Sequence, residues 1–314
     1  MARIMMKKAH NESISEAFEG FMLSAQSRGL TNKTLASYKT HFHSISKRLD
    51  IEKPISQLTK RDLEEMIAKM REEGLSDTSI NSYTRTLKVF FSWCNEERIT
   101  NLNIKLYKAS ETVKETYTDE ELLKLIEKPS RDCNFCEFRN WAIVNFLINS
   151  GCRASTLRNI QIRDVDLKSS RIMGRHSKNR KAQVIPLCQN MVAILKDYMN
   201  VRGGQSEDYL FCNEFGDMLS ESALRQAISK YNRNRGVEKT SLHSFRHTFA
   251  RKYLIDCGGD AFTLQKLLGH STLDMTKHYC AIFDADIAKN FDSFSPLEKM
   301  NAKSTKIKMN AGRK

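Results

Sequence analysis

Four side chains that could act together on one substrate lie within residues 242–279. His243, Arg246 and His270 are hydrogen-bond donors that are cationic or become cationic on protonation, and Tyr279 offers a phenol oxygen. Fixed positive donors stabilise the charge that builds on a phosphodiester during substitution, and a phenol oxygen can be the attacking nucleophile. The set therefore indicates covalent catalysis on a phosphodiester, and the four positions together are far more specific than any one alone.

Each of these residues also has an ordinary structural interpretation. A lone tyrosine such as Tyr279 is most often partly buried, and His270 comes directly after Gly269, where it could simply end a helix. Arg246 considered alone would be a surface residue of a helix. Only their joint occurrence, in one order and spacing, favours catalysis.

The composition indicates a polyanionic partner. The 314 residues include 51 Lys and Arg against 37 Asp and Glu, which gives a formal net charge of +14 and a pI of about 9.4. A chain this basic is expected to meet DNA or RNA, although a merely basic protein would look the same. No apolar run suits a membrane span, and residues 1–13 lack the apolar core of a signal peptide. We therefore expect a cytoplasmic protein.

The cysteines predict no metal centre. Eight are scattered through the sequence and are expected to be reduced. Only Cys133 and Cys136 have C-x-x-C spacing, and neither a second pair nor histidines at ligand spacing follow nearby. We expect neither a metal nor a cofactor, with metal binding by this pair as the minor alternative.

Residues 12–104 are predicted to form a helical bundle. Apolar residues recur there at helical spacing, with short connections. The pattern predicts four helices: from Ser13 to about Gly29, from Thr31, from Thr59 to about Glu73, and from Asp77.

The second half is predicted to be a mainly helical domain with a small antiparallel sheet. Residues 105–116 are polar and read as a linker, which leaves a domain of residues 117–292 between a basic segment, 1–11, and a basic tail, 293–314. Short strands are predicted at 165–167, 171–175 and 182–187, and helices at 140–150, 220–234, 242–256 and 261–268.

Six residues resemble the catalytic motifs of the tyrosine recombinase (lambda integrase) family. His243 and Arg246 match its HxxR motif, and His270 matches the histidine of its LGH motif. Lys178 matches its hairpin lysine when the strands are aligned on the residues 185–187. The full set is Arg153, Lys178, His243, Arg246, His270 and Tyr279. The resemblance covers nearly the whole chain.

The resemblance implies a fold and a reaction. The fold would be a SAM-like helical DNA-binding domain followed by a recombinase catalytic domain. Tyr279 would attack the scissile phosphate of duplex DNA to give a 3′-phosphotyrosine and a free 5′-hydroxyl. The covalent bond would conserve energy, so that rejoining needs no ATP.

The residue types suit the roles that the resemblance implies. Arg153 and Arg246 can neutralise the nonbridging oxygens bidentately, with help from His270, in place of metal ions. Lys178 can protonate the leaving 5′-oxygen as a general acid. His243 can take the phenol proton or organise the pocket, and these alternatives stay open.

Two departures from the family pattern bear on the site. The family commonly has an acidic residue three positions after its first arginine, where this chain has Thr156. A threonine can accept a hydrogen bond from Arg153 but cannot neutralise it. The hairpin also lacks the usual glycines, so Lys181 stays an alternative to Lys178.

The resemblance gives the bundle a role on DNA. The polar positions expected on its second and fourth helices are Asn32, Lys33, Lys39, Arg85 and Lys88. A solvated charged face is the ordinary explanation of such residues. Contact with the DNA backbone becomes attractive because the second half calls for a DNA substrate.

The implied partners are double-stranded recombination sites and further copies of the chain. The resemblance implies a tetramer on DNA, strand exchange through a Holliday junction, and a tail that packs on a neighbouring protomer. A directionality factor or an accessory DNA-bending protein could take part. We expect a short-type integrase of a mobile element. The alternatives are a chromosome-dimer resolving recombinase, a type IB-like topoisomerase and a catalytically silent DNA-binding relative.

Overall fold

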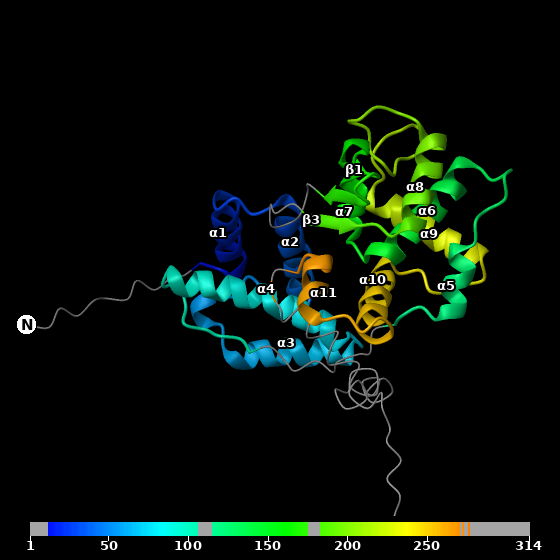
Figure 1. The fold of residues 1–314 in the computed structure, drawn as a ribbon. Coiled ribbons are helices and arrows are strands. Elements are labelled where there is room, and N and C mark those ends of the chain that lie inside the picture. Colours follow the sequence, from blue (N-terminus) through cyan, green and yellow to red (C-terminus); the bar gives the residue numbers. More distant parts are fainter. Residues whose placement is uncertain (1–11, 106–114, 175–182, 271, 273–275, 277–314) are drawn as a thin grey trace, which may run out of the picture. The chain divides into compact units, whose positions relative to one another are not determined.

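The computed structural model describes residues 12–105, 115–174, 183–270, 272 and 276 of the chain (Figure 1). The chain divides into two compact units, Met1–Thr112 and Val113–Lys314. The predicted terminal segments 1–11 and 293–314 lie outside the described residues, as do the candidate residues Lys178 and Tyr279.

Helices make up the described part of the first unit. They are α1 (Ile14–Ser27), α2 (Asn32–Ser46), the short 3₁₀ turn η1 (Ile55–Gln57), α3 (Lys60–Glu72) and α4 (Asp77–Glu96). Each α-helix follows a Ser or Thr whose hydroxyl accepts a backbone N–H of the first turn. These side-chain caps replace hydrogen bonds that the first turn cannot make within the helix, which explains why the sequence predicted the helix starts closely.

Aromatic side chains hold α1, α2 and α4 together. Phe18 stacks on Phe42 with ring centroids 3.7 Å apart, and Phe21 meets Phe90 edge to face at 5.7 Å. α2 and α4 also share a polar contact, in which His41 Nδ1 lies 2.7 Å from Thr86 Oγ1. The apolar sides of these helices are therefore covered, and their polar sides face outward.

The second unit is also mainly helical. Its described helices and helical turns are α5 (Asp119–Ile126), α6 (Phe135–Ser150), α7 (Ala154–Asn159), η2 (Ile162–Asp164), α8 (Gln189–Arg202), α9 (Glu221–Asn234), α10 (Leu242–Arg251), η3 (Lys252–Asp256) and α11 (Ala261–Leu268). α7 and α8 were not among the helices predicted from the sequence. For α8 a signal was present, because Met191, Leu195 and Tyr198 are buried at helical spacing.

A three-stranded antiparallel sheet accompanies these helices, in the order β1 (Val165–Asp166), β2 (Arg171–Gly174) and β3 (Gln183–Pro186). Gly174 pairs with Gln183, so these two residues flank the segment 175–182 that joins β2 to β3. The predicted fold class, mainly helical with a small antiparallel sheet, is confirmed.

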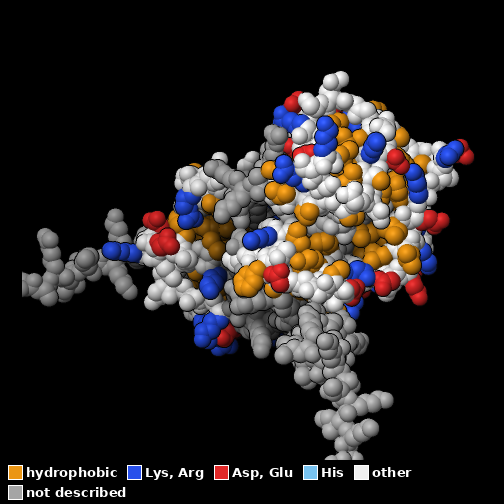
Figure 2. Space-filling view, viewed as in Figure 1, with side chains coloured by type: hydrophobic (Ala, Val, Ile, Leu, Met, Phe, Trp, Pro, Cys, Tyr) orange, Lys and Arg blue, Asp and Glu red, His pale blue; other side chains and the backbone are white. Residues whose placement is uncertain are grey.

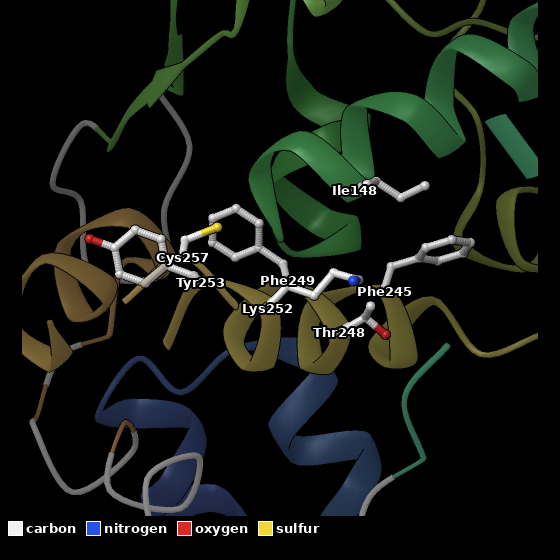
Figure 3. A pocket seen from close by; sticks show the side chains of 7 residues that line it. All are labelled: Ile148, Phe245, Thr248, Phe249, Lys252, Tyr253 and Cys257. Atoms are coloured by element: carbon white, nitrogen blue, oxygen red, sulfur yellow. The ribbon is translucent and has the colours of Figure 1, made fainter. Parts of the chain in front are cut away.

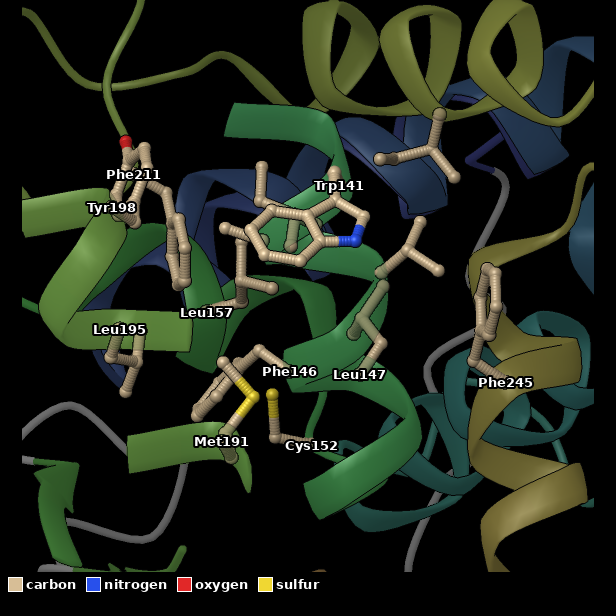
Figure 4. Packing of buried hydrophobic residues seen from close by; sticks show 14 of the residues in the cluster. Trp141, Phe146, Leu147, Cys152, Leu157, Met191, Leu195, Tyr198, Phe211 and Phe245 are labelled. Atoms are coloured by element: carbon tan, nitrogen blue, oxygen red, sulfur yellow. The ribbon is translucent and has the colours of Figure 1, made fainter. Parts of the chain in front are cut away.

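α6 is the central element of the second core. Every residue from 139 to 150 is buried or half-buried, and Trp141, Phe146 and Leu147 lie among side chains from α7, α8 and α10 (Figure 4). The indole Nε1 of Trp141 donates to the carbonyl oxygen of Ile126 at 2.9 Å, which satisfies its polar atom. This packing fixes the position of the C-terminal end of α6, and that end leads into the candidate site.

The predicted helix over 242–256 is present, but its last five residues are π-helical. α10 ends at Arg251 and continues as one wide π-helical turn, η3, in which the Cys257 N–H reaches the Lys252 carbonyl oxygen at 3.0 Å. The Gly259 N–H then bonds to the Tyr253 carbonyl oxygen at 2.8 Å. The spacing of apolar residues could not distinguish this π-helical turn from an α-helix. The turn holds one residue more than an α-helical turn, and this residue rotates the apolar face by only part of a turn.

Gly151 joins α6 to the site through a close approach that only glycine allows. It ends α6 in the left-handed region, with φ of 55°, and a Cβ atom built there would lie 2.6 Å from the ring of Phe249 on α10. Gly236 also has a positive φ, of 71°, but its missing Cβ would point into open space. Alanine in place of Gly236 therefore adds backbone strain alone, whereas alanine in place of Gly151 adds strain and a steric overlap with Phe249.

We expect Gly151→Ala to destabilise the second unit more than Gly236→Ala. The Gly236 variant should lose about 1 kcal/mol from backbone strain, while the Gly151 variant should lose about 2–4 kcal/mol because Phe249 must also move. Urea unfolding of both variants and the parent protein measures this difference. Equal losses in the free energy of unfolding would show that Phe249 moves aside at no cost in stability.

Candidate active site

Three segments of the second unit meet at the turn that follows α11. They are the end of α6 with Arg153, the middle of α10 with Arg246, and the turn formed by Leu268, Gly269 and His270. Gly269 ends α11 in the left-handed region, with φ of 61°, so the chain reverses there and turns its carbonyl oxygens toward the two arginines.

Arg246 lies at the centre of this meeting point and is 5% exposed. Its Nη1 donates to the Gly151 carbonyl oxygen at 2.9 Å, and its Nη2 donates to the Leu268 carbonyl oxygen at 3.0 Å. The same Nη2 lies 2.6 Å from His270 Nε2. One guanidinium group thus joins the ends of α6 and α11 while staying cationic, because carbonyls orient it without removing its charge.

The N-terminal end of the second unit holds α10 in place. The ring of Tyr117 stacks on Phe245 with centroids 4.3 Å apart, and its backbone N–H donates to Thr248 Oγ1 at 2.8 Å. Asn232 Nδ2 donates to the Tyr117 phenol oxygen at 3.0 Å. Residues on both sides of Arg246 are therefore anchored to other elements.

Arg153 approaches the same turn from α6. This half-buried residue precedes α7, and its Nη1 donates to the carbonyl oxygens of Gly269 and Leu268 at 3.1 and 3.4 Å. Thr156 is buried on α7, and its methyl group lies against Gly174 of β2. Among the described residues, backbone carbonyls thus orient Arg153 at the site, and Thr156 packs against the sheet.

The hydrogen bonds of His270 define its tautomer. Arginine has donors only, so Nε2 of His270 must be the acceptor of the bond from Arg246. Nδ1 then carries the proton and donates to Thr276 Oγ1 at 2.8 Å. Thr276 is fully buried and was not among the predicted site residues, since nothing in its sequence position signals this contact.

His270 is neutral near pH 7. Burial, and then the positive charges of Arg246 and Arg153, lower its pKa from 6.5 to about 4. The two arginines therefore supply the positive charge of the cluster, and in the free protein His270 acts as a hydrogen-bonding group.

His243 lies apart from this buried cluster. It is exposed on α10, one helical turn before Arg246, and so on the same side of the helix. Three of the six candidates, Arg153, Arg246 and His270, are thus brought together, and His243 lies at their edge. Lys178, its alternative Lys181, and Tyr279 lie outside the described residues.

The five candidate DNA-contacting residues are all exposed on two packed helices of the first unit. Three lie on α2 and two on α4: Asn32, Lys33, Lys39, Arg85 and Lys88. Figure 2 shows Lys and Arg side chains spread among apolar and acidic ones on the visible face of the molecule.

A pocket of about 190 Å³ lies beside α10 and η3 but does not include the arginine cluster (Figure 3). Its lining is mainly apolar: Ile148, Phe245, Thr248, Phe249, Lys252, Tyr253 and Cys257. Lys252 forms ion pairs with Asp119 and, at 3.0 Å, with Asp256. This lining lacks the convergent donors that a phosphate requires, so the arginine cluster is the better candidate site.

Neither a metal centre nor a membrane span is found in the described part of the chain. Among those residues, no three His, Cys, Asp or Glu side chains are grouped so as to hold a metal ion. Cys133 and Cys136 are half-buried free thiols, and burial raises the pKa of Cys133, which opposes the thiolate that a metal needs. None of the described helices is long and apolar enough to span a bilayer.

Comparison with known families accounts for both units. Residues 115–285 match the model described as "Phage integrase family", and residues 20–98 match "Phage integrase, N-terminal SAM-like domain". The chain belongs to the phage integrase family of tyrosine recombinases. The resemblance seen in the sequence is confirmed.

Two curated relatives are similar over almost their full lengths. The tyrosine recombinase XerC of Thermodesulfovibrio yellowstonii is 30% identical over 288 residues, which cover 87% of this chain and 93% of the relative. The tyrosine recombinase XerA of Pyrococcus furiosus is 31% identical over 291 residues, which cover 91% and 96%.

Two solved structures share the fold. The integrase of transposon Tn1549, in complex with transposon right end DNA, has a TM-score of 0.71 at 18% identity and covers 90% of this chain and 99% of that chain. A lambda integrase tetramer bound to a Holliday junction has a TM-score of 0.69 at 19% identity and covers 86% and 77%.

The lowered pKa of His270 predicts a pH-dependent stability. Between about pH 6.5 and pH 4 the unfolded chain binds a proton at this residue and the folded chain does not, so stability falls as the pH falls. At roughly 1.4 kcal/mol for each tenfold change in proton affinity, the loss is about 3 kcal/mol at most. In urea unfolding between about pH 7 and pH 4.5, His270→Gln should lose less stability than the parent protein. Parallel pH profiles would contradict the prediction.

Proposed function

We propose that this tyrosine recombinase is a site-specific DNA recombinase that cleaves and rejoins duplex DNA through a 3′-phosphotyrosine. The observation that carries the proposal is the convergence of Arg153, Arg246 and His270 on one turn. Two guanidinium groups that both reach the Leu268 carbonyl oxygen are close enough to share a single phosphate.

The cluster suits the charge that develops during phosphoryl transfer. Attack at phosphorus builds negative charge on the nonbridging oxygens, and pre-oriented guanidinium groups stabilise it without reorganising. His270 is neutral in the free protein. A bound phosphate would raise the pKa of His270, so the neutral ring would first accept from Arg246, and only the protonated ring could donate to the phosphate.

The remaining steps are assigned to residues on the motif matches. The phenol oxygen of Tyr279 forms a bond to phosphorus while the bond from phosphorus to the 5′-oxygen breaks. Lys178 gives a proton to that oxygen, and His243 accepts or guides the phenol proton. Attack by a 5′-hydroxyl reverses these steps and releases the tyrosine. The arginines supply the charge, so the cleavage step should not require a metal ion.

DNA is the proposed partner of both units. The net charge of +14 and the exposed polar residues on α2 and α4 support DNA contact by the first unit. The solved neighbours support the substrate and the assembly, because one is bound to transposon end DNA and another is a tetramer on a Holliday junction. We infer that this chain also acts as a tetramer on two duplexes.

The biological role has two candidates. From the sequence we expect the integrase of a mobile element, whereas the curated Xer relatives favour resolution of chromosome dimers. Sequencing the genomic DNA trapped covalently on the protein would separate them. Trapped ends of a mobile element support the first role, and a single chromosomal site outside any such element supports the second.

We expect Tyr279→Phe to bind its site normally but to form no covalent adduct, because only the phenol oxygen is lost. A suicide substrate nicked near the cleavage point should give a denaturant-resistant band with the parent protein, also in excess EDTA. Persistence of the band in the variant would refute the nucleophile. Loss of the parent's band in EDTA, with recovery on adding Mg²⁺ or Zn²⁺, would refute the metal-free mechanism.

We expect the first unit to supply much of the DNA affinity. Two linked units on one duplex raise each other's effective concentration, so a protein starting at Val113 should bind far more weakly than the full chain. Its salt slope should also be smaller, by about 0.9 log units per tenfold salt for each lost phosphate contact. Equal affinity and equal slope would mean that the first unit is no DNA clamp.

Relaxation of plasmids without any recombination site would favour the topoisomerase alternative.

A further inference from the structure

Gln183 contacts the turn that holds both site arginines. It is the first residue of β3, is 9% exposed, and its side-chain Nε2 donates to the Leu267 carbonyl oxygen at 2.6 Å. The next two carbonyls along the chain, of Leu268 and Gly269, accept from Arg246 and Arg153. Three successive carbonyls are thus held by side chains from three different elements.

The sheet register fixes the direction of this side chain. Gln183 and Ile185 are buried and Val184 is exposed, as strand alternation requires. The packing is close, because a Cβ atom built on Gly269 would lie 3.0 Å from Gln183 Oε1. Glycine at this position therefore serves both the left-handed turn and the approach of β3.

Gln183 also has a purely structural explanation. The Leu267 carbonyl belongs to the last turn of α11, where carbonyls lack partners within the helix, so Gln183 could serve only as a helix cap. A cap of this kind would affect stability alone. The neighbouring carbonyls orient guanidinium groups, however, so a shift of this turn would also displace the arginines from the phosphate.

We propose that Gln183 is a positioning residue for phosphoryl transfer: its amide fixes the Leu267–Gly269 turn, and the turn in turn sets Arg153 and Arg246 against the phosphate. This inference rests on the proposed function. In this role Gln183 affects the stabilisation of charge on the nonbridging oxygens and has no effect on the attacking or the leaving oxygen. That distinction makes it testable by substrate chemistry.

The test compares Gln183→Met, which keeps the length but loses the donor, with Val184→Thr on the exposed side of the same strand. Single-turnover cleavage at saturating DNA should be slowed about 10–100-fold by the first change and hardly by the second. On a substrate whose scissile phosphate is a neutral methylphosphonate, the penalty should shrink, because less charge needs stabilising. A sulfur leaving group at the 5′ position should not relieve it.

Lys178→Ala provides the opposite pattern and tests the proposed function separately. Its defect should be relieved by the sulfur leaving group and should persist on the methylphosphonate. If the sulfur substrate fails to relieve it, the general-acid assignment fails, whatever Gln183 does. The Gln183 inference is overturned by a penalty that is equal on phosphate and methylphosphonate, or by one that sulfur relieves.

A second variant guards against a folding defect. Gln183→Leu has no N–H to donate and adds no charge to the site, so it should show the same substrate dependence as Gln183→Met. Thermal unfolding and DNA affinity are measured for both variants. Lowered thermal stability with unchanged cleavage in either folded variant would show that Gln183 is only a helix cap.

Discussion

The hydrogen bonds of one buried guanidinium group hold the candidate site together. Arg246 joins the end of α6, through the Gly151 carbonyl, to the turn after α11, through the Leu268 carbonyl and His270. A buried cation is costly unless its donors are satisfied, and hydrogen bonds to a charged group contribute about 1.5–3 kcal/mol each. The two helix ends therefore cannot separate without leaving a charge unsatisfied in the interior, which keeps the site assembled before any substrate arrives.

The same arrangement explains how Arg153 is oriented in the absence of the acidic residue that is usual in the family. Two backbone carbonyls of the Leu268–Gly269 turn orient Arg153, and Thr156, three positions later, packs against the sheet. A carboxylate would have oriented Arg153 but would also have reduced the positive potential of the site. Carbonyl dipoles orient it and leave its full charge for an anion, at the cost of making Arg153 dependent on the position of the turn.

Burial and the two arginines determine the protonation state of His270. Two cations beside a buried imidazole disfavour its protonation, and the bond from Arg246 leaves Nδ1 as the protonated nitrogen, facing Thr276. The histidine therefore serves the resting protein as a neutral link between Arg246 and the chain that follows α11. A phosphate placed between the arginines would reduce the positive potential at His270 and so raise its pKa.

The sequence by itself determined the helix starts of the first unit, the mixed helical and sheet character of the second, the family, and three residues that meet at the site. Caps, periodicity and motif spacing are local, so they can be read along the chain. Only the tertiary structure decided that the predicted helix 242–256 ends as the π-helical turn η3. It also decided that carbonyls orient Arg153 in place of Thr156, and that Thr276 and Gln183 contact the cluster. These features depend on atoms from elements far apart in sequence, such as Gln183 and Leu267, which lie 84 positions apart. Local patterns carry no information about such contacts, because packing alone brings the two atoms together.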